Sequence, residues 1–239
     1  MSPSSRPSIN SWTHEWAQKN NLKSIYKQQT TSTNADAKLS SETGFELHIT
    51  DEQTQGRGRG QNKWQQSSPG DGLLSTWCFT GPSPQPVFAA RMGLSLYQSL
   101  SHTWPDANFS LKAPNDIYLN EGKMAGLLIE LTQVENDKCR FYIGLGLNAF
   151  AAPSLPDQKT SFLSEDQPVE LTNWELFCQT FYNALLKLQT SSHQAHLTPQ
   201  ERTSLMEALN KHPNFKYKDI RPDGSLQRSN GQWCHWSDL

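Results

Sequence analysis

Arginine and glycine alternate in one short segment, Gly56-Arg57-Gly58-Arg59-Gly60, which Lys63 and Trp64 follow closely. Glycine permits backbone conformations that other residues avoid, and arginine binds carboxylate or phosphate with a planar pair of donors. The segment therefore fits a loop that closes over an anionic ligand. Two other interpretations stay open at this point: an exposed basic turn, and a fragment of a nucleic-acid-binding arm.

Three further segments carry residues suited to the same chemistry. Lys112-Ala113-Pro114-Asn115-Asp116 follows a short apolar run and contains strong turn residues. Lys123 stands at the head of an apolar run, next to Gly126, although a solvent-exposed edge lysine would look the same. Ser32-Thr33-Asn34 precedes helix-forming residues, which is typical of a helix N-cap, and donors at such a position can also hold a polar ligand group.

The spacing of apolar residues predicts the elements that position these segments. Helices are predicted at 87–100 and 172–188, the second with a capping box of Thr172 and Glu175, and a third begins at Thr198. Gly144 and Gly146 inside a strand indicate the close approach of a ligand or of another backbone. Strands are predicted at 22–26, 45–50, 73–80, 109–112, 117–119, 123–131 and 140–148.

Composition narrows the function classes. A net charge of −2 and a sequence pI of about 6.4 do not favour a large nucleic-acid footprint. The four cysteines are far apart and His193 and His196 have no partner ligands, so neither a disulfide framework nor a metal site is predicted. No apolar run reaches the roughly 18 residues of a membrane span, and the N-terminus lacks a signal-peptide core. We expect a cytoplasmic protein with no membrane partner.

Five motifs, in this order along residues 25–190, resemble those of the biotin protein ligase family, also called biotin–[acetyl-CoA-carboxylase] ligases. Five co-linear motifs are far more specific than any one of them. They are Ser32-Thr33-Asn34, Gln53-x-x-Gly56-Arg57-Gly58-Arg59, Lys112-x-Pro114-Asn115-Asp116, Lys123-x-x-Gly126-Leu127-Leu128-Ile129-Glu130 and Gly144-x-Gly146-x-Asn148.

The resemblance implies a fold and a reaction. The fold would be α/β (α+β) and class II synthetase-like, with a mixed sheet flanked by helices and a short C-terminal β appendage. The Ser, Asn and Pro content of residues 1–21 predicts a flexible tail with one helical turn. By the resemblance, 22–192 would be the catalytic domain, and 193–239 a helix plus a small, truncated SH3-like β domain. The enzyme would activate biotin with ATP and Mg²⁺ to biotinyl-5′-AMP. It would then transfer biotin to a lysine of the biotin carboxyl carrier protein of acetyl-CoA carboxylase. The short segment before Ser32 leaves no room for a winged helix-turn-helix, so no DNA partner is expected; a homodimer is compatible with the resemblance.

The resemblance also assigns site residues. Arg59 and Lys123 would act at the reacting carboxylate, Asp116 would orient or deprotonate the acceptor lysine, and Trp64 would cover the adenylate. Lys112 and Asn148 would serve the phosphates and Mg²⁺, and Arg59, Lys123, Lys112 and Asp116 form the catalytic set. Biotin would be bound by Ser32, Thr33, Asn34, Gln53, Gly56, Arg57, Arg59, Lys123, Gly126, Gly144 and Leu145. ATP or the adenylate would be bound by Arg59, Trp64, Lys112, Asn115, Asn148 and Ser161.

The sequence departs from the family pattern in two of these motifs. Gln61-Asn62 stands where many relatives have another Gly-Arg pair, and Ala113 stands where a tryptophan is usual. The alternatives are a lipoyl or octanoyl ligase or transferase of the same superfamily, and a biotin-binding homologue with weak turnover. A non-catalytic RNA-binding module would instead use Arg57, Arg59 and Lys63 with Trp64.

Overall fold

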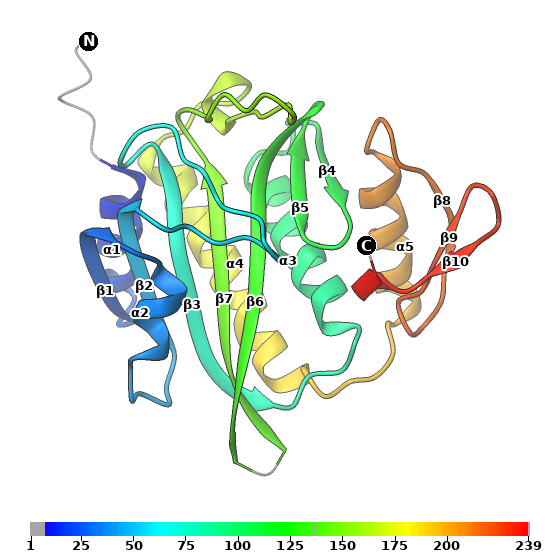
Figure 1. Cartoon of the computed structure of the whole chain (residues 1–239), viewed down its shortest axis with the longest axis horizontal. Coiled ribbons are helices and arrows are strands. Elements are labelled where there is room, and N and C mark those ends of the chain that lie inside the picture. Colours follow the sequence, from blue (N-terminus) through cyan, green and yellow to red (C-terminus); the bar gives the residue numbers. More distant parts are fainter. Residues whose placement is uncertain (1–7, 136, 239) are drawn as a thin grey trace.

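A seven-stranded mixed sheet organises the structure, a computed structural model that describes residues 8–135 and 137–238 (Figure 1). The strand order is β1-β2-β3-β7-β6-β5-β4. The first two strands pair in parallel, and every other neighbouring pair is antiparallel. The strands are β1 (Lys23–Thr30), β2 (Glu46–Gln53), β3 (Gly72–Pro82), β4 (Phe109–Lys112), β5 (Asp116–Leu119), β6 (Gly122–Glu135) and β7 (Lys138–Asn148).

The predicted α/β fold is confirmed, and each predicted strand is present. Strand β1 continues to Thr30 rather than ending at residue 26, and β6 continues to Glu135 rather than ending at residue 131. Both extensions are largely exposed and polar. Without apolar alternation they carry no strand signal, and it is the ladder to the neighbouring strand that keeps them extended.

Three long helices cover one face of the sheet, and one short helix lies on the other (Figure 1). Trp77 of β3 packs against Trp16 and Phe181 from two of the long helices, at ring-centroid distances of 6.0 and 5.6 Å. On the opposite face, Ala37 of the short helix packs against Tyr142 of β7. None of the described helices combines the length and the apolar character needed to cross a bilayer. The long helices are α1 (Ile9–Lys19), α3 (Phe88–Thr103) and α4 (Leu171–Ser191), and the short helix is α2 (Thr33–Lys38).

The N-terminal part of the chain differs from the expected flexible tail. Residues 1–7 lie outside the described residues, but helix α1 begins at Ile9 and runs for 11 residues. Ser8 caps it, because its Oγ accepts a hydrogen bond from the Ser11 N–H at 2.9 Å. Ile9 and Trp16 are almost fully buried against the sheet. The prediction of a loose tail for residues 8–21 was wrong, since apolar residues seven apart place one helical face in the core.

The predicted helix starts have mixed outcomes. Thr198 caps α5 (Pro199–Asn210), with a reciprocal hydrogen bond from Glu201, so that prediction is confirmed. The capping box of Thr172 and Glu175 was wrong, because α4 begins at Leu171 and the Asn173 side chain accepts from the Glu170 N–H at 2.9 Å. Glu175 instead pairs with Lys19 of α1 at 2.7 Å. Asn173, three residues after Glu170, thus takes the capping role that was predicted for Glu175, three residues after Thr172.

The C-terminal part joins the main sheet through buried contacts. Arg91 of α3, 3% exposed, forms an ion pair with Glu201 of α5 at 2.8 Å. Trp236 is 1% exposed and donates its indole N–H to the Pro114 carbonyl at 3.0 Å. This part consists of α5, an antiparallel sheet of order β10-β9-β8 and a short 3₁₀ turn at Trp236–Asp238. Another 3₁₀ turn, Leu163–Glu165, precedes α4. The three strands are β8 (Tyr217–Ile220), β9 (Leu226–Arg228) and β10 (Trp233–Cys234).

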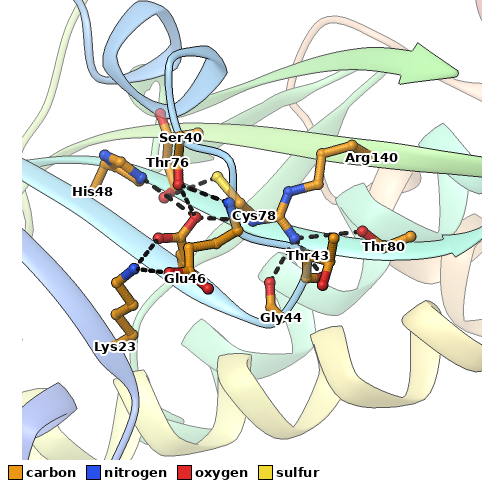
Figure 2. A network of polar contacts seen from close by, with 11 residues as sticks. Lys23, Ser40, Thr43, Gly44, Glu46, His48, Thr76, Cys78, Thr80 and Arg140 are labelled. Atoms are coloured by element: carbon orange, nitrogen blue, oxygen red, sulfur yellow. Dashed lines mark hydrogen bonds and ion pairs between the residues drawn. The ribbon is translucent and has the colours of Figure 1, made fainter. Parts of the chain in front are cut away.

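A buried ion-pair network fixes the segment between α2 and β2 against the sheet (Figure 2). Glu46, 1% exposed, accepts hydrogen bonds from Arg140 Nη2 at 3.0 Å and from Ser40 Oγ at 2.8 Å. Lys23 Nζ lies 3.2 Å from the other oxygen of Glu46. Arg140 also donates to the Thr43 carbonyl at 2.9 Å. Through this network, the segment that follows α2 and the start of β2 share one anchor in β7.

Candidate active site

A cavity of about 620 Å³ lies on the face of the sheet that carries α2. Its walls come from α2, from β3, β6 and β7, and from the segments 112–116 and 155–158. The segment that follows β2, cyan in Figure 1, crosses in front of the sheet and covers the cavity. The cavity thus brings together segments from separate parts of the chain, as the motif order predicted.

Glycines on adjacent strands form the floor of the cavity. Gly126 of β6 pairs with Gly146 of β7, and Gly144 lies two residues before Gly146 in the same strand. A Cβ atom on Gly144 would lie 2.6 Å from Asn34 Oδ1, and one on Gly146 would collide with the Trp64 ring. The close approach at Gly144 and Gly146 is made by side chains of the site itself and not by another backbone, and a ligand against these glycines stays a prediction.

The glycine-arginine segment is a short hairpin. The Trp64 N–H donates to the Gly56 carbonyl at 3.0 Å, and the Gly58 N–H donates to the Asn62 carbonyl at 2.8 Å. Gly60 takes a φ of +59° at the turn, a conformation that favours glycine. The hairpin lays the Trp64 ring on the glycine floor. The indole N–H of Trp64 is buried without a hydrogen-bond partner in the described part of the chain.

Uncharged polar groups line the side of the cavity formed by α2. Gln53 Oε1 accepts a hydrogen bond from the Thr33 N–H at 2.9 Å and lies 3.3 Å from the Thr33 hydroxyl. The Thr76 hydroxyl donates to Asn34 Oδ1 at 2.5 Å. Ser32 is the N-cap residue of α2, but its side chain makes no capping hydrogen bond. These hydrogen bonds fix the groups that the cavity presents on this side.

Glu130 of β6 connects three parts of the site. Its carboxylate accepts hydrogen bonds from Asn34 Nδ2 and Lys38 Nζ, each at 2.7 Å, and from Arg57 Nη2 at 3.1 Å. Partial burial opposes ionisation of Glu130, but the hydrogen bonds from Lys38 and Asn34 and the charge of Arg57 outweigh it, so the pKa of Glu130 is lowered. Arg57 is therefore directed toward Glu130 in this structure, at the rim of the cavity.

Replacing Glu130 with glutamine is expected to lower the free energy of unfolding by about 1–3 kcal/mol at neutral pH, the range for a hydrogen bond to a charged group. A lowered pKa in the folded state stabilises the fold above the unfolded pKa, and this contribution is lost as the pH falls through the folded pKa. The difference from wild type should therefore begin to shrink below the ordinary glutamate pKa of about 4.3 and vanish once the pH lies below the lowered pKa of the folded state. Urea unfolding at several pH values measures it, with the exposed Glu121→Gln as control. A pH-independent difference would contradict this account.

Cationic side chains line the side of the cavity formed by β4, β5 and β6. Lys123 Nζ lies 2.8 Å from Asp116 Oδ1 and 5.8 Å from the centroid of the Trp64 ring. Lys112 Nζ lies 3.4 Å from the Tyr118 hydroxyl. Arg59 also lines the cavity. The cavity is lined by five cationic side chains and only two carboxylates, those of Asp116 and Asp157, among the described residues. The cationic side chains are those of Arg57, Arg59, Lys63, Lys112 and Lys123. This excess of positive charge favours an anionic ligand.

Most of the predicted site residues lie at the cavity, and three do not. Gly56 closes the hairpin through its carbonyl, and a Cβ there would lie 2.7 Å from the Trp64 carbonyl oxygen. Asn148 is buried and donates to the Ser161 carbonyl at 3.1 Å, while the Ser161 hydroxyl donates to the Gly122 carbonyl at 3.0 Å. The predicted residues that line the cavity are Ser32, Thr33, Asn34, Gln53, Arg57, Arg59, Trp64, Lys112, Asn115, Asp116, Lys123, Gly126, Gly144 and Leu145.

Several residues of the site were not predicted from the sequence. Ser75 lines the cavity from β3, and Asp157 and Gln158 line it from the loop after β7. Glu130 was part of a motif but received no role. Asn115 lines the cavity, but its amide nitrogen donates to the Leu127 carbonyl at 2.5 Å and so holds β6. Loop residues such as Asp157 have no local pattern that could have revealed them, since only the fold brings them to the cavity.

Comparisons with known proteins give a family and several relatives for this chain. The family model described as "Biotin/lipoate A/B protein ligase family" matches residues 23–148. A biotin–[acetyl-CoA-carboxylase] ligase of Mycobacterium tuberculosis is 31% identical over 144 residues, which cover 56% of this chain and 52% of that protein. The enzyme of the same name from Paracoccus denitrificans is 33% identical over 132 residues, covering 52% of this chain and 54% of that protein. The match thus spans about half the length of these curated relatives.

A solved structure shows the same fold. The biotin protein ligase from Aquifex aeolicus in complex with biotin and ATP superposes with a TM-score of 0.66 at 20% identity. The match covers 89% of this chain and 95% of the Aquifex chain. At this identity the likeness concerns the architecture, which includes the mixed sheet described above.

Proposed function

Because this chain belongs to the biotin/lipoate A/B protein ligase family, we propose that it activates biotin with ATP to biotinyl-5′-AMP and transfers biotin to a lysine of an acceptor protein. The acceptor we propose is the biotin carboxyl carrier protein of acetyl-CoA carboxylase, in line with the names of the relatives from Mycobacterium tuberculosis and Paracoccus denitrificans. The observation that carries the proposal is the division of the cavity into an uncharged polar side and a cationic side.

The uncharged side suits the head group of biotin. A ureido group is neutral and offers both hydrogen-bond donors and an acceptor, and the hydroxyl and amide groups of Ser32, Thr33 and Gln53 can meet it. The positions of Thr33 and Gln53 are already fixed by the contacts between Thr33, Gln53 and Thr76.

The cationic side suits the reaction itself. In the first step, a carboxylate oxygen of biotin attacks the α-phosphorus of ATP and pyrophosphate leaves. Two anions must approach each other, so fixed positive charge from Arg59, Lys112 and Lys123 lowers the barrier. In the second step, the acceptor lysine attacks the carbonyl carbon of the mixed anhydride, AMP leaves, and Asp116, which lines the cavity, takes up the proton of the lysine. Trp64, lying over the floor, excludes water from this anhydride.

Mg²⁺ would enter this site with ATP, as part of the substrate. The carboxylates of Asp116 and Asp157 line the cavity, and Mg²⁺ is often held by one or two carboxylates together with substrate phosphates. Across residues 8–135 and 137–238, no three His, Cys, Asp or Glu side chains are grouped as a metal site. The two carboxylates therefore suit a Mg²⁺ ion that enters the cavity already bound to the phosphates of ATP. Asn148, which the sequence analysis assigned to Mg²⁺, does not line the cavity.

Incubation of the protein with biotin, MgATP and a biotin carboxyl carrier domain tests the proposal. We expect the carrier to gain one biotinyl group on a single lysine, detectable as a mass increase of the intact carrier. The control is a carrier whose acceptor lysine is replaced by arginine. A carrier that stays unmodified, while an established biotin ligase modifies it in the same buffer, would contradict the proposed transfer.

The second candidate function is that of a lipoyl or octanoyl ligase, since the family model covers biotin and lipoate enzymes alike. A ligand that binds only the folded state stabilises it by RT ln(1 + [L]/Kd), about 1.4 kcal/mol at ten times Kd. We expect biotin to raise the thermal midpoint of the protein and lipoate or octanoate to leave it unchanged. The reverse order of effects in a thermal-shift titration would favour the second candidate.

A further inference from the structure

Lys112, on the cationic side of the cavity, lies among aromatic rings from two distant parts of the chain. Its Nζ is 5.6 Å from the ring centroid of Tyr118 and 5.2 Å from that of Phe215. Both distances fall within the roughly 6 Å over which a cation is attracted to an aromatic face. Tyr118 belongs to β5, beside the cavity, whereas Phe215 belongs to the segment between α5 and β8.

His212 completes this aromatic cluster of Tyr118, His212 and Phe215. Its ring centroid is 4.6 Å from that of Tyr118 and 4.8 Å from that of Phe215. The imidazole is 2% exposed, and its Nδ1 accepts a hydrogen bond from the Asn214 N–H at 3.2 Å. Burial, and then the ammonium groups of Lys112 and Lys216, lower the pKa of His212. The ring is therefore neutral at physiological pH. It packs against Tyr118 and Phe215, the two rings near Lys112, without adding a second positive charge.

We propose that Phe215 is a positioning residue for the reaction: its ring holds the Lys112 ammonium at the cavity, where Lys112 binds the phosphates of ATP. This inference rests on the proposed function. A lysine side chain loses considerable rotamer freedom when it is fixed. The aromatic faces restrict Lys112 before ATP arrives, so less of this entropy is lost on binding. The C-terminal part of the chain thereby takes part in the chemistry of a cavity that the main sheet forms.

The exposure of Phe215 makes the proposal testable by substitution. Because 41% of Phe215 is exposed, replacing it removes mainly its contacts with Lys112 and His212 and leaves the main core intact. Phe215→Leu keeps an apolar side chain but removes the aromatic face, and Phe215→Tyr keeps the face. A matched control is Leu186→Ala, on α4 at 37% exposure.

We expect Phe215→Leu to lower kcat/KM for ATP in adenylate formation about five-fold, the size of a partly exposed cation–π contact, and to leave KM for biotin unchanged. Phe215→Tyr and Leu186→Ala should both behave as wild type. A structural role alone would lower activity toward both substrates in parallel, and that result would contradict the proposal.

A second measurement does not depend on catalysis. Reductive methylation with ¹³C-formaldehyde labels the lysine ammonium groups without removing their charge, and Lys112→Met identifies the Lys112 resonance by its loss. We expect this resonance to be shifted by the aromatic rings in wild type and Phe215→Tyr, and to move toward the other lysines in Phe215→Leu. If Phe215→Leu keeps both the wild-type shift and the wild-type kcat/KM for ATP, the positioning role is overturned while the proposed function stands. A wild-type protein that forms no adenylate would instead overturn the proposed function and this inference with it.

Discussion

Replacing Lys123 with alanine is expected to slow adenylate formation about 10²–10³-fold, the typical effect of removing one preorganised electrostatic stabiliser. Its ammonium group lies 2.8 Å from Asp116 and faces the Trp64 ring, and 21% of the side chain is exposed. In this setting the charge is fixed before the substrates meet, so no reorganisation is needed as negative charge develops. Water that enters the space left by alanine must reorganise and cannot supply a fixed charge. We expect a loss of the same order for Arg59→Ala.

Pyrophosphate release in the presence of biotin and MgATP measures this effect. The matched control is Lys159→Ala, because Lys159 is 67% exposed and pairs with Glu121 at the surface in the segment next to Lys123. Its variant should stay within about two-fold of wild type, since exposed ion pairs contribute less than about 1 kcal/mol. Circular dichroism establishes that each variant is folded. Near-normal rates in both Lys123→Ala and Arg59→Ala would contradict the roles given to the cationic side.

Replacing Arg140 with methionine is expected to lower the free energy of unfolding by about 3–5 kcal/mol, because it removes one partner of a buried ion pair. Arg140 is 4% exposed and Glu46 is 1% exposed. Without the guanidinium, Glu46 keeps Ser40, the half-exposed Lys23 and, at 3.9 Å, the buried His48 ring as partners among the described residues (Figure 2). The carbonyl of Thr43 loses its donor as well.

Urea unfolding of the two proteins at neutral pH gives this difference directly. The control is Lys138→Met in the same strand, since Lys138 and Glu135 form an ion pair in which both side chains are more than half exposed. The double variant Glu46→Gln, Arg140→Met should recover part of the loss, because the two residues act on one another. An Arg140→Met protein as stable as Lys138→Met would show that the network contributes little.

The strands and the long helices follow from the sequence because their apolar spacing is strong. The stripe of apolar residues along α4, and the alternation of apolar and polar residues in β2, each indicate a buried face. The cap of α4 and helix α1 were predicted wrongly, for different reasons. At α4 two polar patterns overlap, Glu170 with Asn173 and Thr172 with Glu175; the first caps the helix, while Glu175 pairs with Lys19 of α1. At α1 the apolar signal of Ile9 and Trp16 lies within a polar, serine-rich segment that hides it.

The candidate site was predictable where it consists of short motifs and not where it consists of tertiary contacts. Lys112 and Lys123 each lie in a motif, so both could be named from the sequence. The pairing of Lys123 with Asp116, and the rings around Lys112, depend on the pairing of β4, β5 and β6. Phe215 is about 100 residues from Lys112 along the chain, and no local pattern connects them. Such contacts can be seen only once the chain is folded.

The most direct test of the central claim, that this cavity joins the carboxylate of biotin to AMP, is mass spectrometry of the wild-type protein after incubation with biotin and MgATP. We predict biotinyl-5′-AMP and pyrophosphate in equal amounts, with neither formed when biotin is omitted. If neither product forms while biotin binding is shown by thermal shift, the cavity binds the vitamin without activating it, and the account is contradicted.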